Sequence, residues 1–188
     1  MRNMLKKVGC KAQWSSDPKI IEQATKLIFP GVGSFDLAMK KLLDSGLVPI
    51  LEKKVLHEKT PLLGVCLGMQ LLTQGSEEGE MPGLGWVKAQ TKKFRPTDKK
   101  LKIPHMGWNE VVPKVKSKLT KNLDQHSRFY FVHSYFVECE NPENILFESD
   151  YGQRFASGIF SDNIFGVQFH PEKSHRFGMQ LMANYLEI

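Results

Sequence analysis

The chain has 188 residues, and its content of 41% hydrophobic and 24% charged residues is ordinary for one folded domain with its own core. We therefore expect a single domain over residues 1–188. No apolar run approaches the roughly 18 residues of a membrane helix, and the first residues lack the apolar core of a signal peptide. These features favour a cytoplasmic location with no membrane contact.

The net charge of +6 lies mostly in lysine-rich segments between residues 92 and 121. Such a patch can bind nucleic acid, but no helix-turn-helix, zinc-finger or RNA-binding signature accompanies it. We interpret the lysines as a solvated basic face and expect no nucleic-acid partner. A docking face for an acidic partner stays open as an alternative.

The first half of the chain alternates predicted strands with predicted helices. The strands are expected over residues 11–14, 26–29 and 62–65. The helices are expected over residues 1–8, 35–44 and 49–57, with a further one starting at Asp17-Pro18. Because strands that alternate with helices are joined by right-handed crossovers, this half predicts a parallel sheet.

The second half changes to shorter segments with a period of two. These segments predict strands, many of them antiparallel, over residues 86–94, 109–113, 129–137, 145–148, 155–160 and 164–169. A last helix is expected to begin at Ser174. A doubly wound chain usually begins with a strand that becomes central, whereas this one opens with a helix. Either the fold departs from that habit, or its first strand is missing.

The three cysteines, Cys10, Cys66 and Cys139, are odd in number and widely spaced. They predict neither a disulfide framework nor a zinc site, and we expect no metal. Cys66 differs from the others because it follows the apolar run 62–65 and precedes leucines at helical spacing. With Gly64 and Gly68 on either side, it fits the strand–turn–helix of a nucleophile elbow. The N-terminus of the helix that follows favours the thiolate. A buried structural cysteine is the alternative.

The second chemical signal is His170, which ends the predicted strand 164–169 and is followed by Pro171 and Glu172. A thiol that attacks an acyl group needs a base, and the base needs a carboxylate to orient it. Cys66, His170 and Glu172 therefore form a candidate triad. Both Cys66 and His170 are predicted at the carboxyl ends of strands, where α/β sheets bind ligands.

The third signal is the sequence Gly31-Val32-Gly33, which also follows a predicted strand. Backbone N–H groups here, together with that of Leu67, are a candidate oxyanion hole. A plain turn or phosphate loop is the alternative. Neither G-x-x-x-x-G-K-[ST] nor G-x-G-x-x-G occurs, so nucleotide binding is not predicted.

Taken together, these residues resemble the class I (triad) glutamine amidotransferases, through residues 64–70 (GVCLGMQ) and 168–172 (QFHPE). Within that family the chain resembles the glutaminase subunits of imidazole glycerol phosphate synthases. The motifs that carry this narrower resemblance are residues 30–35 (PGVGSF), 104–109 (PHMGWN), 130–135 (YFVHSY) and 172–174 (EKS).

The resemblance implies a flavodoxin-like three-layer sandwich: a mixed, mostly parallel central sheet with helices on both faces, plus a small antiparallel sheet. The family normally has an apolar strand and a Gly-Asn loop before the segment that matches residues 1–3. The usual first strand is therefore expected to be missing here.

The resemblance also implies the chemistry. Cys66 would form a thioester with glutamine and release ammonia, His170 would be the acid and base, and Glu172 would orient it. Val32, Gly33 and Leu67 would supply the oxyanion hole, in part after a peptide flip triggered by a partner. No cofactor is expected, because the thiol, imidazole and backbone donors suffice.

Two further groups of residues follow from the motifs. The positions expected to hold the substrate glutamine are Gly31, Gly68, Gln70, Glu78, His133, Ser134 and Tyr135. The positions expected at the partner interface are Met106, Trp108, Tyr130 and Lys173. The partner implied is a cyclase subunit with a (β/α)8 barrel, bound as a heterodimer. It would use the ammonia to make imidazole glycerol phosphate and an aminoimidazole carboxamide ribotide in histidine biosynthesis.

Two alternatives to this function remain. Paralogous subunits supply ammonia to a sugar amidotransferase in surface polysaccharide synthesis, and residues 128–130 and 174–179 look somewhat like theirs. The other alternative is a non-catalytic subunit that acts through its interface alone. An intact candidate triad argues against that second alternative.

Overall fold

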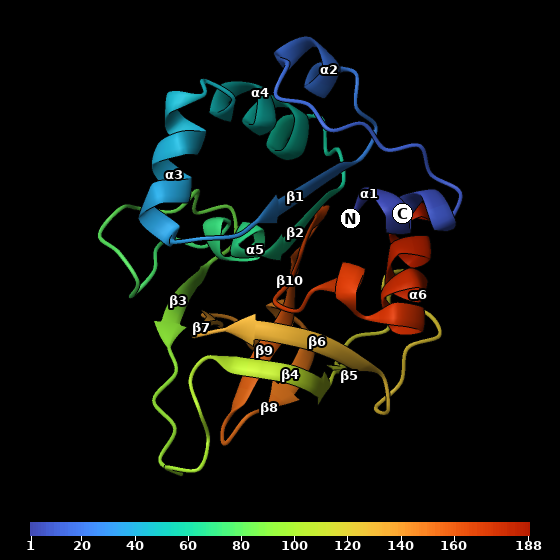
Figure 1. Ribbon diagram of the computed structural model, residues 1–188. Helices are drawn as coiled ribbons and strands as arrows, with labels where there is room; N and C mark the ends of the chain where they lie inside the picture. Colours follow the sequence, from blue (N-terminus) through green and yellow to red (C-terminus); the bar gives the residue numbers. More distant parts are fainter.

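The computed structural model describes residues 1–188, and its centre is an eight-stranded mixed sheet (Figure 1). Strands β1 (Leu27–Gly31), β2 (Leu62–Cys66) and β10 (Ile164–Val167) are parallel, with β2 in the middle. The sheet continues in the order β9, β7 and β3, and β8 pairs with β9 and with β5. The bounds of these five strands are β3 Ala89–Lys93, β5 Val112–Pro113, β7 Tyr135–Cys139, β8 Ile145–Asp150 and β9 Arg154–Ser161.

A second, two-stranded sheet consists of β4 (His105–Glu110) and β6 (Arg128–His133), paired antiparallel. The helices are α1 Arg2–Lys7, α2 Pro18–Glu22, α3 Phe35–Asp44, α4 Val48–Glu52, α5 Leu67–Leu71 and α6 His175–Leu186. A π-helix, Lys53–His57, continues α4. No helix is both long and apolar enough to cross a lipid bilayer.

Successive side chains of β2 point to opposite faces of the sheet, so each face packs against its own layer of helices. Leu63 and Val65 belong to a hydrophobic cluster that also takes in side chains of α1 and α6. Leu62 points to the opposite face and packs in a second cluster with Met69 and Leu72. Because every residue of β2 is buried, helices cover both faces of the parallel strands, as Figure 1 shows with α1 and α6 on one side and α3, α4 and α5 on the other.

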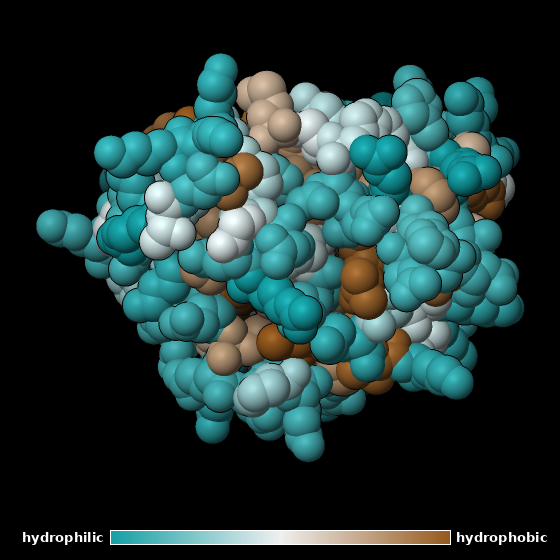
Figure 2. Space-filling view, turned by 90° about the horizontal axis from the view of Figure 1, so that it is seen from below, coloured by the Kyte–Doolittle hydropathy of each residue, from teal (hydrophilic) through white to brown (hydrophobic).

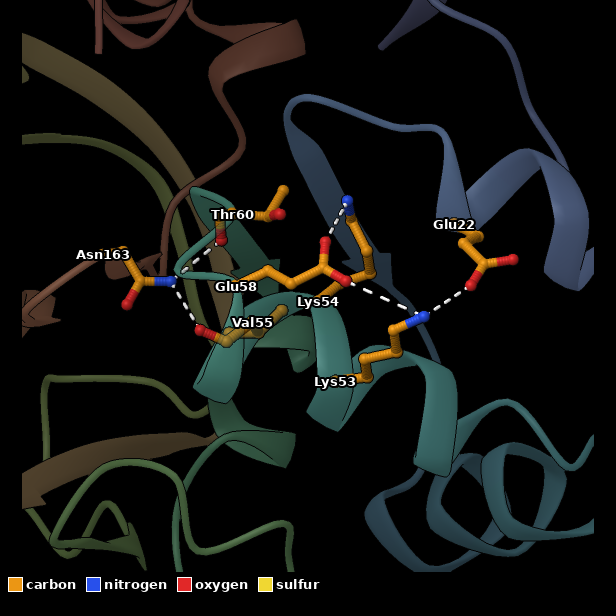
Figure 3. A network of polar contacts seen from close by, with 7 residues as sticks. All are labelled: Glu22, Lys53, Lys54, Val55, Glu58, Thr60 and Asn163. Atoms are coloured by element: carbon orange, nitrogen blue, oxygen red, sulfur yellow. Dashed lines mark hydrogen bonds and ion pairs between the residues drawn. The ribbon is translucent and has the colours of Figure 1, made fainter.

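The amino-terminal ends of the parallel strands are held by polar contacts (Figure 3). The amide nitrogen of Asn163 donates to the carbonyl oxygens of Val55 (2.9 Å) and Thr60 (2.8 Å). Lys54, buried in the π-helix, pairs with Glu58 at 2.8 Å. These contacts fix the π-helix to the turn before β10 and to the start of β2.

Four predictions differ from the structure, one of them the strand over residues 109–113, which divides at Val111 between β4 in the small sheet and β5 in the large one. The sheet is less parallel than expected, because only the pairings of β2 with β1 and β10 are parallel. Residues 11–14 form no strand: Trp14 is 73% exposed, and no neighbouring strand pairs with the segment. The predicted strand 129–137 divides at Ser134 into β6 and β7, which belong to different sheets.

Candidate active site

Cys66 ends β2 and immediately precedes α5, in a backbone conformation that L-residues rarely adopt, with φ 55° and ψ −114°. Such strain is stored where a side chain must be aimed at one place. The flanking glycines are needed for space and not for a left-handed backbone, because neither has a positive φ. A Cβ on Gly68 would overlap the carbonyl oxygen of Phe29, and one on Gly64 would lie 2.8 Å from the carbonyl oxygen of Gly68. The glycines therefore let α5 approach β1 and β2 closely.

His170 follows β10 and begins a short 3₁₀ turn, Pro171–Lys173. Its backbone N–H donates to the carbonyl oxygen of Tyr130 (2.8 Å). The hydroxyl of Ser174 donates to the carbonyl oxygen of His170 (2.6 Å) and accepts from the N–H of Tyr130 (2.9 Å). Ser174 was predicted only to begin a helix, but it also locks the backbone of His170 to β6.

The imidazole of His170 is held on one side and open on the other. Nδ1 lies 2.9 Å from Oε1 of Glu172, whereas Nε2 is buried without a hydrogen-bond partner. The second carboxylate oxygen of Glu172 is also buried and unpaired. Buried polar atoms are nearly always satisfied in native proteins, and of these two residues only His170 lines the cavity, so Nε2 is the atom that a group bound there can reach.

Charge explains the ionisation of this pair. Burial alone would lower the pKa of His170, but the Cys66 thiol and the Glu172 carboxylate outweigh burial and raise the pKa to about 9. Burial would raise the pKa of Glu172, yet the hydrogen bond from His170 lowers it. The arrangement therefore favours an imidazolium between a carboxylate and a sulfur.

A cavity of about 350 Å³ opens over Cys66. It is lined by Val32, Gly33, Cys66, Leu67, Gln70, Glu78, Pro104, Val132, His133, Ser134, Tyr135, His170 and Lys173. The structure thus brings most of the predicted site residues to one place, at the carboxyl ends of the parallel strands. Gly31 and Gly68 do not line the cavity. They lie against each other, since a Cβ on Gly31 would come within 2.8 Å of the Gly68 nitrogen.

Residues 2–187 match the family described as glutamine amidotransferase class-I. The chain belongs to this family. It is 57% identical over 187 residues to "Imidazole glycerol phosphate synthase subunit HisH 2" of Methanococcus maripaludis, covering 100% of this chain and 92% of that protein. It is 50% identical over 186 residues to the protein of the same name from Pseudomonas aeruginosa, with 99% and 92% covered.

Solved structures agree on the fold. A glutamine amidotransferase superposes with a TM-score of 0.74 at 18% identity, covering 99% of this chain and 90% of that one. A glutamine amidotransferase from Thermotoga maritima gives 0.63 at 18% identity, covering 98% and 75%. The predicted family, the narrower resemblance and the α/β fold class are thereby confirmed, although the sheet is mixed and not mostly parallel.

In this amidotransferase, Gln70 is not free in the cavity. Its amide nitrogen donates to Oε1 of Gln168 (2.9 Å) and lies 3.4 Å from the carbonyl oxygen of Tyr135. The amide nitrogen of Gln168 lies 3.7 Å from Sγ of Cys66. A chain of amides therefore joins the segment of Tyr135 to the sulfur. Gln168 was part of a motif but had no predicted role. Contact between Gln70 and substrate stays a prediction.

His133, which lines the cavity, forms a buried pair with His105. Nδ1 of His133 donates to the carbonyl oxygen of Tyr135 (2.7 Å), so its Nε2 accepts from Nδ1 of His105 (2.9 Å). Nε2 of His105 in turn lies 3.3 Å from the amide nitrogen of Asn109. Burial lowers the pKa of His105 to about 4 and that of His133 to about 3. Both rings are neutral and satisfied, and they support the backbone of Tyr135.

The residues predicted at a partner interface lie on or beside the small sheet. Met106 is 60% and Trp108 41% exposed, and Lys173 lies over the ring of Tyr130 at 5.5 Å. Trp108 stacks flat on His175, with ring centres 5.4 Å apart. Figure 2 shows, from below the view of Figure 1, small hydrophobic areas within a mostly hydrophilic surface. Large exposed apolar side chains on such a surface are candidates for partner contact.

Proposed function

We propose that this chain is a glutaminase that hydrolyses L-glutamine to L-glutamate and ammonia with Cys66, His170 and Glu172. One observation carries the proposal. A strained cysteine lies in a cavity beside a buried imidazole whose Nδ1 is held by a carboxylate and whose Nε2 has no partner. The class-I glutamine amidotransferase family supports the reaction.

The geometry supports a two-stage reaction. The proton shared by Cys66 and His170 rests on Nε2 of the imidazolium; Sγ of Cys66 attacks the side-chain amide carbon of glutamine, and Nε2 then gives this proton to the leaving nitrogen. Ammonia departs and a γ-glutamyl thioester remains. His170 next takes a proton from water, the hydroxide attacks the thioester, and the returning proton reaches the departing sulfur.

Two charged groups that arise in this reaction, the imidazolium of His170 and the oxyanion of the tetrahedral intermediate, each need a stabilising contact. Glu172 orients His170 through Nδ1 and stabilises the imidazolium, as the carboxylate does in other triads. The N–H of Leu67 has no acceptor within α5 because this residue begins the helix. We assign it to the oxyanion, with Val32 or Gly33 as the second donor across the cavity.

We further propose that the chain works as the ammonia-supplying subunit of an imidazole glycerol phosphate synthase. The nearly full-length relatives at 57% and 50% identity that carry this name support the assignment. In this proposal a cyclase subunit docks on the surface of Met106, Trp108, Tyr130 and Lys173 and receives the ammonia.

The test is glutamate release from glutamine, measured with the chain alone and then with a candidate cyclase subunit and its nucleotide ligand. We expect a low basal rate that rises by orders of magnitude with the partner, and no rate in Cys66→Ala. A response only to a sugar amidotransferase system would keep the chemistry and change the pathway. If neither partner system gave glutamate release, and a thiol-reactive glutamine analogue did not label Cys66, the chain would be a non-catalytic interaction subunit.

A further inference from the structure

The start of α3 is capped by a residue far away in the sequence. Ser34 occupies the N-cap position but its side chain makes no capping hydrogen bond. Instead, Oε2 of Glu78 accepts from the N–H of Phe35 at 2.9 Å. Glu78 also lines the cavity over Cys66. One carboxylate therefore joins the cavity wall to the helix that directly follows Val32 and Gly33.

Asp36, in the first turn of α3, makes hydrogen bonds back to the loop that carries Glu78. Its Oδ2 accepts from the N–H of Glu80 (3.0 Å) and its Oδ1 from the N–H of Met81 (3.1 Å). A Cβ on Gly79 would overlap the Asp36 carboxylate, so the loop can lie this close only because residue 79 is glycine. Three charge-assisted hydrogen bonds thus clasp residues 78–81 to the first turn of α3.

On the other side, the same loop is tied to β3. The N–H of Glu77 donates to the carbonyl oxygen of Thr91 (2.9 Å), and its carboxylate pairs with Arg95 (2.8 Å). Residue 78 therefore lies between two anchors, one on β3 and one on α3. Without Asp36, the bond between Glu78 and Phe35 would be the one side-chain contact left between this loop and α3, and the direction of the Glu78 carboxylate would depend on it.

We propose that Asp36 is a positioning residue for glutamine binding. It does not line the cavity, but its hydrogen bonds to Glu80 and Met81 set where Glu78 presents its carboxylate. The partner group on the substrate is the α-ammonium, the only cation of glutamine at neutral pH. The same contacts hold Glu78 against Phe35, three residues after Val32. This inference rests on the proposed glutaminase function.

The first experiment compares Asp36→Ala and Asp36→Asn with Asp44→Ala in glutaminase assays with the activating partner. Asp44 is a matched control on the same helix, since its side chain is 65% exposed and pairs only with Lys40 at 3.6 Å. We expect Asp36→Ala to raise KM for glutamine about tenfold while kcat changes much less, which is loss of ground-state binding. Asn keeps one acceptor oxygen, so its effect should be intermediate. Asp44→Ala should leave both constants unchanged.

The second experiment is a double-mutant cycle with Gly79→Ala. Alone, the new methyl group should displace the loop and raise KM, because it would overlap the Asp36 carboxylate. In the Asp36→Ala background that clash is gone, so adding Gly79→Ala should change KM little. Additive effects of the two substitutions would overturn the proposal, since they would mean that the residues act separately.

The third experiment separates this inference from the proposed function. Calorimetric titration of glutamine into Cys66→Ala measures binding without turnover, and the same titration into Cys66→Ala with Asp36→Ala should give a Kd about tenfold weaker. Equal Kd values would overturn the role of Asp36 and leave the glutaminase intact. No glutamine binding to Cys66→Ala, combined with no hydrolysis by the unmodified chain, would overturn both.

Discussion

The two ends of the parallel strands β1, β2 and β10 are built in opposite ways. At the amino end, Asn163 donates to two carbonyl oxygens, and the hydroxyl of Tyr185 lies 2.6 Å and 2.8 Å from two more. At the carboxyl end, Cys66 is strained, and Nε2 of His170 and Oε2 of Glu172 are buried without partners. Polar groups are satisfied at the amino end, whereas at the carboxyl end Nε2 of His170, a residue that lines the cavity, is left available.

The difference reflects a difference in role: one end stabilises the fold, and the other forms the candidate active site. A satisfied buried hydrogen bond contributes to stability, while an unsatisfied buried group costs free energy. A fold can tolerate such costs where a substrate will later supply the missing partners. The comparison therefore predicts that substitutions at the carboxyl end change activity more than stability, and that substitutions at the amino end do the reverse.

The largest effect is expected at Cys66. Cys66→Ala should lower glutamine hydrolysis by about 10⁴-fold or more, because the nucleophile is gone, while the protein stays folded. Cys66→Gly should be equally inactive. Its thermal unfolding should nevertheless occur at a higher temperature than that of Cys66→Ala, since glycine tolerates the positive φ. At a buried position without strain, a glycine variant is ordinarily less stable than the alanine variant. If Cys66→Gly unfolded at a lower temperature than Cys66→Ala, the backbone at residue 66 would not be strained.

The next effect is expected at Glu172. Glu172→Gln keeps the shape but removes the charge that stabilises the imidazolium, and kcat should fall by roughly 10²–10⁴-fold. The pKa of His170, about 9 in the unmodified protein, should fall as well, because burial then acts with less opposition. NMR titration of the His170 ring measures this directly. An unchanged pKa would show that Cys66 alone supports the imidazolium.

A third effect separates His170 from the buried pair His105 and His133. The pair is neutral with pKa values of about 4 and about 3, against 6.5 when unfolded. Below pH 6.5 the unfolded chain therefore binds more protons, and stability falls as the pH drops. At pH 5 each ring should cost about 2 kcal/mol relative to pH 7. His170 acts oppositely: its contribution is present below pH 6.5 and is lost as the pH rises through about 9.

Urea unfolding at pH 5 and pH 7 checks this sign. The difference in unfolding free energy between the two pH values should shrink in a variant with His105→Asn and His133→Gln, whose amides do not titrate. Other groups titrate equally in both proteins, so they cancel in the comparison. An equal pH difference in both proteins would mean that the pair is not the source of acid sensitivity.

Local patterns in the sequence predicted much of the fold. The helical spacing over residues 35–44 coincides with α3, which buries one stripe of side chains, and the apolar run 62–65 coincides with β2, in which every residue is buried. The division of residues 129–137 at Ser134 could not be predicted in this way. Period two continues through the break, and only tertiary pairing assigns β6 to β4 and β7 to β3 and β9.

In the candidate site, too, some residues could be predicted from local patterns and others could not. Cys66 and His170 stand at strand ends, so their convergence could be predicted from local patterns alone. The contacts of Gln168, Ser174 and Asp36 could not, because their partners lie 102, 44 and 45 residues away in the sequence. A polar side chain gives no local signal of which distant backbone group it will meet. Such residues are found only once the chain is folded.

The smallest effects are expected at the amino end, where Figure 3 offers a matched pair. Asn163→Ala leaves the carbonyl oxygens of Val55 and Thr60 without their donor and should cost about 1–3 kcal/mol of unfolding free energy. Asn163→Asp should cost more, because a carboxylate would face two carbonyl oxygens.

Lys53→Met is the control: the Lys53 side chain is 54% exposed, so its ion pairs with Glu22 and Glu58 should contribute nothing measurable to stability. All three variants should keep the kcat of the unmodified protein. A fall in kcat with Asn163→Ala at unchanged stability would break the comparison, because the amino end would then be part of the catalytic machinery.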